Sequence, residues 1–416
     1  MNEQIITPGL NTPLTLKNGV VIRNRFLKSA MSEQLGDKNH DPVPGLANAY
    51  RRWADGGIGL AVSGNIMIDR RALGEPHNVV LDGQSDLNAF RHWTGAATGN
   101  GAHLWAQLNH PGKQIPAFIV KEPVAPSAIP LGRGLEKAFN TPRAMTGDEI
   151  QATIQRFADA AGQARDVGFT GVQIHGAHGY LVSQFLSPRH NQRTDQWGGS
   201  AENRMRFVLE IYHAMRGVVG DSFPIGIKLN SADFMKDGFT EEESIGVVKA
   251  LAEAGIDLIE ISGGTYESPS MMGDGHDKRP ESTRRREAYF LTYAEKVRAV
   301  TDVPLAVTGG FRSAEGMTDA LVSRATDMVG LARPLALNPD LPNNAMADPA
   351  YRFDWQEPST GMKGLDQAMM LGLVWYEQQI HRMARSQAPK ITLSPWRAVW
   401  ATLRGIGYQA FRKRRV

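Results

Sequence analysis

The feature that most constrains the fold is an eightfold alternation of short apolar runs and longer helical patterns. Most of the runs contain β-branched residues, and each precedes a stretch that suits a helix, which is typical of βαβ units on a parallel sheet. Eight such units in 416 residues predict a closed (β/α)8 TIM barrel with insertions. The expected strands are Phe26–Met31, Gly59–Gly64, Ala102–Leu108, Gly171–His175, Pro224–Asn230, Leu258–Gly263, Pro304–Gly309 and Asp327–Leu331.

An open, doubly wound sheet is the competing architecture, and two observations favour the barrel. The first strand is not followed by the Gly-x-Gly-x-x-Gly turn of a Rossmann fold. Polar residues also stand at the carboxyl ends of many different strands, where barrel active sites are built. They are Ser29, Ser32, Gln107, His175, His178, Lys228, Asn230 and Thr308.

Several segments fall outside the repeated units. Asn18-Gly19 between apolar pairs predicts an N-terminal hairpin. Long insertions follow the third strand (residues 110–146) and the sixth (residues 263–280), and the first resembles a lid or wall of a site. Residues 366–385 predict one helix that closes the barrel. We therefore expect a barrel over residues 1–345, a closing helix and linker over 346–390, and a basic amphipathic tail over 391–416.

The charge of the chain is unevenly distributed. Residues 381–416 carry nine Lys or Arg and no acidic residue, so the overall charge of +3 leaves −6 on residues 1–380. An acidic body with a basic tail argues against nucleic acid as a partner. The absence of Cys excludes thiolate nucleophiles, disulfides and iron–sulfur clusters. The first residues lack a signal-peptide pattern and no window of 18 apolar residues occurs, so we expect a cytoplasmic protein. We also expect a homo-oligomer.

The most informative motif is His175-Gly176-Ala177-His178-Gly179-Tyr180 at the end of the fourth strand. Two imidazole N–H groups there could converge on one substrate carbonyl and stabilise an enolate. A phenol, with an ordinary pKa of about 10, could protonate a carbanion-like carbon. The alternatives are two loop histidines satisfied by local hydrogen bonds and a tyrosine that forms a wall. A zinc site is disfavoured because the HxxH pair lacks a third ligand at an obvious spacing.

The run from Ile174 to Phe207, IHGAHGYLVSQFLSPRHNQRTDQWGGSAENRMRF, closely resembles the signature of the Old Yellow Enzyme family of FMN-dependent reductases. Weaker similarity extends over about residues 5 to 340. The resemblance implies that His175 and His178 bind the substrate carbonyl and that Tyr180 delivers the proton. Tyr266 is a further substrate-binding candidate. Ser200 is expected to cap a helix, and Arg193, Asp195, Asn203 and Arg204 are expected to be structural.

The resemblance also implies contacts to the flavin ring at the ends of several strands. The candidates are Ser29, Ala30, Ser32, Gly64, Gln107 and Lys228. The hydroxyl of Ser32 could bond to flavin O4, and Gly64 would let the ring approach the backbone. Lys228 stands where the family more often has Arg, so the bidentate contact of a guanidinium is lost. A salt bridge within the barrel is the alternative role for Lys228.

The loops after the seventh and eighth strands predict a phosphate site, as in many TIM barrels. Gly309 and Gly310 end the seventh strand, and Ala332 and Arg333 follow the eighth. Arg333 could clamp a phosphate, whereas a plain turn is the alternative for the two glycines. Ala332 replaces the usual Gly of the family.

Together with these residues, the resemblance implies an FMN-dependent ene-reductase that takes hydride from NADPH or NADH and reduces the C=C bond of an enone or enal. Other redox chemistry on FMN, such as desaturation, and a non-catalytic barrel acting through its tail are the alternatives. In the tail, Pro395 starts a helix with Trp396, Val399, Trp400 and Leu403 at helical spacing. It could pack on the barrel or another subunit, bind an anionic membrane surface, or bind a protein or polyanion.

Overall fold

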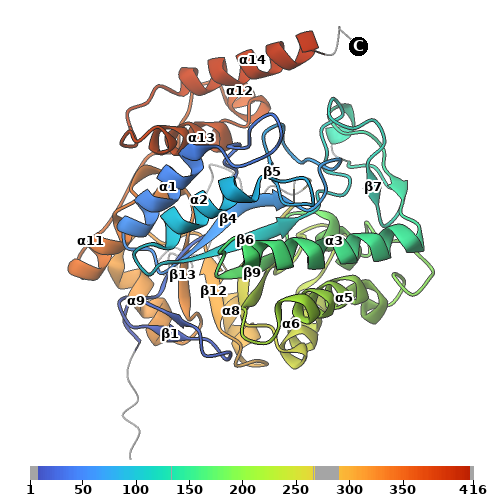
Figure 1. Ribbon diagram of the computed structural model, residues 1–416, viewed down its shortest axis with the longest axis horizontal. Coiled ribbons are helices and arrows are strands. Elements are labelled where there is room, and N and C mark those ends of the chain that lie inside the picture. Colours follow the sequence, from blue (N-terminus) through green and yellow to red (C-terminus); the bar gives the residue numbers. More distant parts are fainter. Residues whose placement is uncertain (1–7, 133, 266, 268–289, 413–416) are drawn as a thin grey trace, which may run out of the picture.

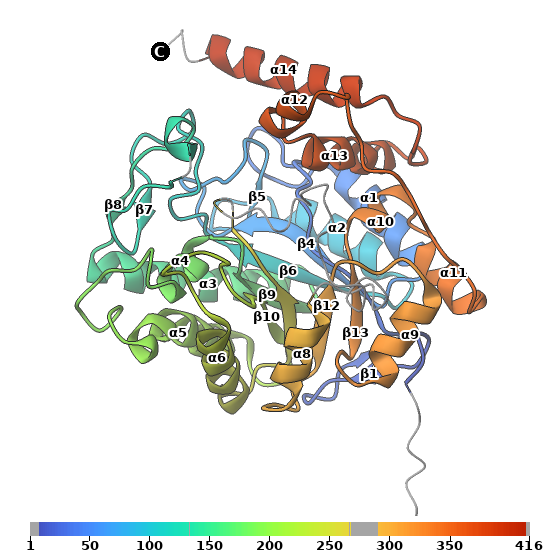
Figure 2. The ribbon, with the colours of Figure 1, turned by 180° about the vertical axis from the view of Figure 1, so that it is seen from behind.

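The computed structural model describes residues 8–132, 134–265, 267 and 290–412, and in this part of the chain eight parallel strands form a closed barrel (Figures 1 and 2). β3 pairs with both β13 and β4, which closes the sheet. The TIM-barrel prediction is therefore confirmed. The barrel strands are β3 (Phe26–Lys28), β4 (Leu60–Met67), β6 (His103–Asn109), β9 (Gly171–Gly176), β10 (Ile225–Asn230), β11 (Leu258–Ser262), β12 (Leu305–Thr308) and β13 (Met328–Leu331).

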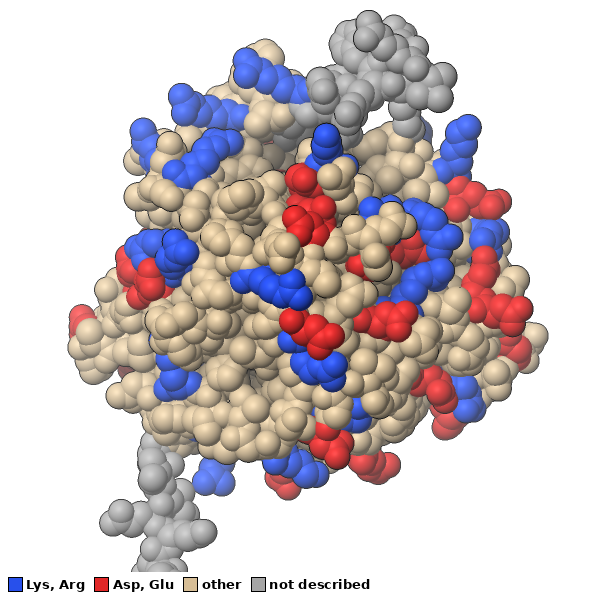
Figure 3. Space-filling view, in the orientation of Figure 1, with Lys and Arg blue, Asp and Glu red and all other residues tan. Residues whose placement is uncertain are grey.

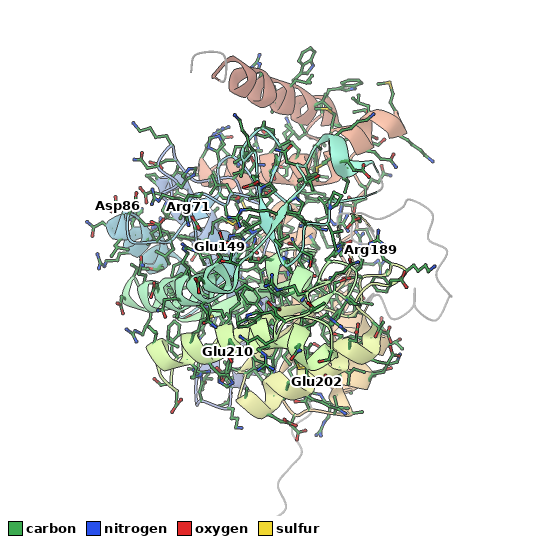
Figure 4. The ribbon with its side chains drawn as sticks, turned by 90° about the vertical axis from the view of Figure 1, so that its right-hand side faces the viewer. Arg71, Asp86, Glu149, Arg189, Glu202 and Glu210 are labelled. Carbon is green, nitrogen blue, oxygen red and sulfur yellow. The ribbon has the colours of Figure 1, made fainter. Side chains whose placement is uncertain are left out.

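Helices surround this barrel in chain order, and several begin at side-chain caps. Thr146 and Thr240 form capping boxes with Glu149 and Glu243, and Ser200 caps its helix as predicted. Figure 4 shows Glu149 on α3 and Glu202 and Glu210 on α5, side by side on one flank. The helices are α1 (Pro44–Asp55), α2 (Leu87–Thr98), α3 (Gly147–Asp166), α4 (Leu181–Leu186), α5 (Ala201–Val219), α6 (Glu241–Ala254), α8 (Leu291–Arg298), α9 (Ala314–Val322), α10 (Arg333–Leu337), α11 (Leu341–Ala347), α12 (Lys363–Ala368), α13 (Leu371–Ala384) and α14 (Pro395–Arg412).

The amino-terminal end of the barrel is filled by an apolar cluster. The predicted hairpin, β1 (Leu14–Thr15) and β2 (Val21–Ile22), contributes Leu14, Leu16 and Ile22 to it. Trp105 fills the centre, where a Cβ on Gly171 or Gly226 would lie 2.5 or 2.8 Å from its ring. The polar residues of the opposite, carboxyl end therefore rest on a dry and closely packed floor.

The insertion after β6 forms small elements of its own. They are β7 (Val124–Ala125), β8 (Arg143–Ala144), which pairs with it, and the 3-10 turn η1 (Leu135–Lys137). The strand β5 (Val79–Val80) adds to β4 outside the barrel. Of the insertion after β11, residues 263–265 and 267 are described, and Tyr266 lies outside the described residues.

The prediction of one helix over residues 366–385 is wrong in its continuity. The structure divides the segment into α12 and α13, because Met370 adopts a left-handed φ of 47°. Asp366 instead accepts hydrogen bonds from Ser359 and Thr360, which folds α12 back on the preceding loop. α13 packs on α1 and α10. It therefore lies beside α1, the first helix of the barrel, and its role as a closing helix stays a prediction.

Candidate active site

A continuous belt of polar side chains crosses the barrel above its apolar floor. Gln107 donates to Gln173 at 2.7 Å, and Gln173 donates to Glu260 at 2.8 Å. Glu260 also accepts from Thr308 at 2.7 Å, and the hydroxyls of Thr308 and Ser29 lie 2.6 Å apart. The belt thus joins β6, β9, β11, β12 and β3. It brings together the predicted residues Ser29 and Gln107, although their strands are far apart in the sequence.

Lys228 of β10 enters the same belt through a buried ion pair. Its Nζ lies 3.0 Å from Glu260 Oε1, and the two side chains are 3% and 0% exposed. Burial alone would raise the pKa of Glu260, but the Lys228 charge and the hydrogen bonds of Thr308 and Gln173 lower it below its ordinary value. Glu260 is therefore ionised, and the pair holds a fixed cation and anion at the carboxyl end of the barrel.

Three rings gather at the carboxyl end of β9. The centroids of His175 and His178 lie 5.0 Å apart, and those of His175 and Tyr180 lie 4.7 Å apart, both edge-on. The Tyr180 hydroxyl lies 3.5 Å from Asn65 Nδ2 of β4. Because Tyr180 is only 6% exposed, its phenol lies inside the protein and not in bulk water.

Both imidazoles are neutral at neutral pH. Burial, the neighbouring His178 and the Lys228 ammonium hold the pKa of His175 well below its usual value. Burial and Lys228 likewise depress the pKa of His178. His175 Nδ1 accepts from the Ala177 N–H at 3.3 Å, which places the ring proton on Nε2. His178 Nε2 lies 2.8 Å from Ser262 Oγ.

The backbone at His178 is held in an uncommon conformation. Its φ is 62°, a left-handed value that costs a non-glycine residue roughly 1–3 kcal/mol. Asn230 Oδ1 accepts from the His178 N–H at 3.2 Å, and the residue forms a bridge with Thr265. Neighbouring strands therefore impose this turn, which places the second imidazole beside the first.

The residues that follow β3 have closer partners within the protein than the sequence suggested. The Ser32 hydroxyl donates to both oxygens of Glu75, at 2.7 and 2.8 Å. A Cβ on Gly64 would lie 2.7 Å from the Met31 carbonyl, so this glycine is required by the packing of β4 against the chain after β3. Ala30 packs against the apolar cluster at the base of the barrel.

The expected phosphate loops lie on adjacent strands. Gly309 and Gly310 have φ values of 104° and 100°, conformations that favour glycine. They follow Thr308, which lies opposite Gly330 in the β12–β13 register, and Ala332 and Arg333 follow β13. The Arg333 guanidinium lies 3.1 Å from Glu357 and beside the Tyr376 ring. Arg333 is thus near the expected site but is paired with a carboxylate.

The residues that sequence reasoning missed are the partners in these networks. Gln173 and Glu260 could have been suspected, because each is a lone polar residue within an apolar strand. A second network, Lys113–His190–Glu267, joins three loops above the barrel. Lys113 Nζ lies 2.9 Å from His190 Nδ1, and His190 Nε2 lies 3.3 Å from Glu267. Burial lowers the pKa of Lys113 to about 8, and Arg189, labelled in Figure 4, lies next to the same carboxylate.

Residues of the long family motif other than the three rings hold the loops together, as predicted. Arg193 donates to the carbonyls of Pro126 and Met145 and pairs with Asp195. Arg204 donates to Leu186 O and pairs with Glu243. Among the described residues, no cluster of three or more His, Asp or Glu side chains is arranged to hold a metal ion.

Comparison with known proteins places this site in a family. Residues 9–349 match the NADH:flavin oxidoreductase / NADH oxidase family. The NADH-dependent flavin oxidoreductase iliE of Hypocrea jecorina (strain QM6a) is 38% identical, covering 80% of this chain and 88% of that protein. The protein of the same name from Neonectria sp. (strain DH2) is 39% identical over 81% of this chain, which spans about half of that protein (47%).

Solved structures show the same architecture. The old yellow enzyme homologue from Zymomonas mobilis has a TM-score of 0.70 and 26% identity, covering 83% of this chain and 94% of that chain. 2-Naphthoyl-CoA reductase has a TM-score of 0.74 and 29% identity, covering 82% of this chain and 52% of that chain.

The chain therefore belongs to the NADH:flavin oxidoreductase / NADH oxidase family, of the Old Yellow Enzyme type. Its cofactor is FMN, and its relatives are NADH- or NADPH-dependent. The residues at the carboxyl end of the barrel fit this group. Gln107 offers an amide donor and acceptor, Lys228 offers a buried cation, and the left-handed Gly309-Gly310 turn suits a phosphate loop.

Proposed function

We propose that this protein is an ene-reductase that reduces the activated C=C bond of an α,β-unsaturated carbonyl compound with hydride from NADH or NADPH. The observation that carries the proposal is the cluster of two neutral imidazoles and one enclosed phenol at the end of β9. The names of similar proteins support the direction of the reaction, since 2-naphthoyl-CoA reductase and morphinone reductase share the fold.

In this proposal the imidazoles bind the carbonyl oxygen of the substrate. Neutral His175 donates from Nε2, because its Nδ1 already accepts from the Ala177 amide. His178 supplies a second contact from a ring that its strained backbone and Ser262 hold in place. Two preorganised donors stabilise the negative charge that develops on this oxygen. Because both rings are neutral, they stabilise this charge as hydrogen-bond donors and not as imidazolium acids.

Tyr180 is the proposed proton donor to Cα. Its ring packs edge-on against His175, so the phenol lies next to the proposed carbonyl site. Asn65 Nδ2 lies next to the phenol oxygen and orients it. FMN, when bound, supplies hydride to Cβ. Gln107, Lys228 and Ser29 would hold its ring, and the loops at Gly309–Gly310 and Ala332–Arg333 its phosphate.

An anaerobic stopped-flow titration tests the proposal directly. The purified yellow protein is first reduced with NADH or NADPH and then mixed with a panel of small enones and enals. We expect bleaching by a reduced nicotinamide and recovery of colour with an enone, with product saturated at the C=C bond. Bleaching by nicotinamide without recovery by any panel member would contradict the reductase assignment. A protein that stays colourless with added FMN would instead support a non-catalytic barrel.

A further inference from the structure

The C-terminal helix α14 is amphipathic, and the barrel covers only part of its apolar surface. One face is anchored, since Ala398 and Val399 are 0% and 3% exposed and belong to the main core cluster, as does Leu393 just before the helix, at 8%. α13 fixes its approach, because Trp375 Nε1 donates to Leu393 O at 2.9 Å and Gln379 makes two hydrogen bonds with the Lys390 backbone. The start of the helix is therefore held firmly on the body.

Another face of α14 exposes large apolar side chains. Trp396, Trp400 and Leu403 are 43%, 63% and 46% exposed and follow one another at spacings of four and three residues. The sequence has eight tryptophans, and these two are the exposed ones in the described part of the chain. Six of the eleven exposed large hydrophobic side chains in that part lie between residues 362 and 403. Exposure of this kind is thus concentrated at one edge of the molecule.

Positive charge surrounds this apolar face. Arg397 and Arg404 are exposed beside the tryptophans, and residues 381–416 contain nine basic and no acidic residues. Figure 3 shows Lys and Arg without Asp or Glu at the upper left edge, where Figure 1 places the start of α14 over α13. The rest of the chain has a net charge of −6. Basic side chains therefore gather where the apolar ones are exposed.

We infer that the outer face of α14 docks on an anionic lipid surface. Tryptophan and arginine beside each other suit the interface of a bilayer, where the indoles enter the headgroup region and the guanidinium groups contact lipid phosphates. A second copy of this chain fits less well, because the same face would bring like charges together. No helix in the described part of the chain is long and apolar enough to cross a bilayer. The helix would therefore lie on the surface.

The test uses the full-length protein loaded with FMN and vesicles of phosphatidylcholine with or without phosphatidylglycerol. We expect sedimentation with the anionic vesicles, loss of binding in high salt, and a blue shift of tryptophan fluorescence. Trp396→Ser/Trp400→Ser should weaken binding by about 10-fold or more. Arg397→Gln/Arg404→Gln should weaken it by about 25-fold, at about five-fold per charge.

Matched controls separate this surface from general stickiness. Val322→Ser on α9 and Arg91→Gln on α2 remove an exposed apolar and an exposed basic side chain elsewhere, and they should leave binding unchanged. Equal binding of all variants, or no sedimentation with anionic vesicles, would overturn the inference. So would a dimer that only the tryptophan variant dissociates, or preferential binding to duplex DNA. Ene-reduction can fail or succeed independently of each of these outcomes.

Discussion

Tyr180 is an enclosed side chain for which we propose a definite chemical role. Its ring packs against His175, and its hydroxyl lies beside Asn65. Tyr180→Phe should slow the enone half-reaction by about 10² to 10⁴. The reduction by nicotinamide should remain largely intact, because that half-reaction needs no proton from the phenol. Stopped-flow rates of the two half-reactions check this, and an equal loss in both would assign Tyr180 to binding alone.

The ion pair of Lys228 and Glu260 predicts a large stability effect. Both side chains are buried, so Lys228→Met leaves an uncompensated carboxylate and should cost about 3–5 kcal/mol of unfolding free energy. Lys228→Arg keeps the charge and should cost less. The double variant Lys228→Met/Glu260→Gln should recover part of the loss. Urea unfolding of the wild type and the three variants measures these differences. An unchanged unfolding free energy in Lys228→Met would show that the pair contributes nothing to stability.

The buried carboxyl group of Glu75, which lies near Ser32 and Glu377, should make the stability of the protein depend on pH. Burial and the nearby Glu377 raise the pKa of Glu75 to about 7, above its ordinary value of 4.5. Since the folded pKa is the higher one, the stabilising contribution is present below pH 4.5 and is lost as pH rises through about 7. Tm should therefore fall over this range. Glu377→Gln removes the like charge and should flatten the fall.

The control for this pH effect is Glu253→Gln, which removes an exposed carboxylate on α6. It should leave the pH profile of Tm as in the wild type. A profile equally steep in Glu377→Gln would show that burial alone raises the pKa of Glu75.

At the scale of elements, the register between β12 and β13 determines where Thr308 lies in the polar belt. Thr308 lies opposite Gly330, where a Cβ would be 2.0 Å from Thr308 Oγ1. Gly330→Ala must displace this hydroxyl from Glu260 and Ser29, and we expect a loss of about 1–3 kcal/mol and weaker FMN retention. Gly246→Ala on α6 meets no atom within 4 Å and should stabilise by about 0.5–1 kcal/mol. Urea unfolding and the FMN absorbance after dialysis compare the two, and equal behaviour would contradict the argument.

Elements with a strong local pattern were predictable from the sequence, and those defined by distant partners were not. The eight strands lie within a few residues of their expected places, because short apolar runs report burial directly. The break at Met370 was missed, since its helix-forming neighbours give no local signal. The polar belt was missed in part, because Gln173 and Glu260 are 87 residues apart and meet only when the barrel closes. The flavin contact of Ser32 stays a prediction, and its hydrogen-bond partner Glu75, in the loop after β4, was missed.

At the scale of the whole molecule, α14 belongs both to the core and to the surface. Deleting residues 391–416 would remove the buried Leu393 and Val399 and leave the Trp375 N–H, on a residue 2% exposed, without its acceptor. Lost apolar burial and one unsatisfied donor together should cost about 3–5 kcal/mol. Tm and urea unfolding should show this loss, whereas Trp396→Ser/Trp400→Ser should leave stability nearly unchanged.

The two changes therefore separate packing from docking. A truncated chain that fails to bind vesicles is ambiguous, because its barrel is also weakened where α13 meets α1. The double tryptophan variant alters only the exposed face, so a loss of vesicle binding at unchanged Tm assigns the effect to that face. If the truncated chain were as stable as the full one, α14 would contribute nothing to packing, and its buried stripe would need another explanation.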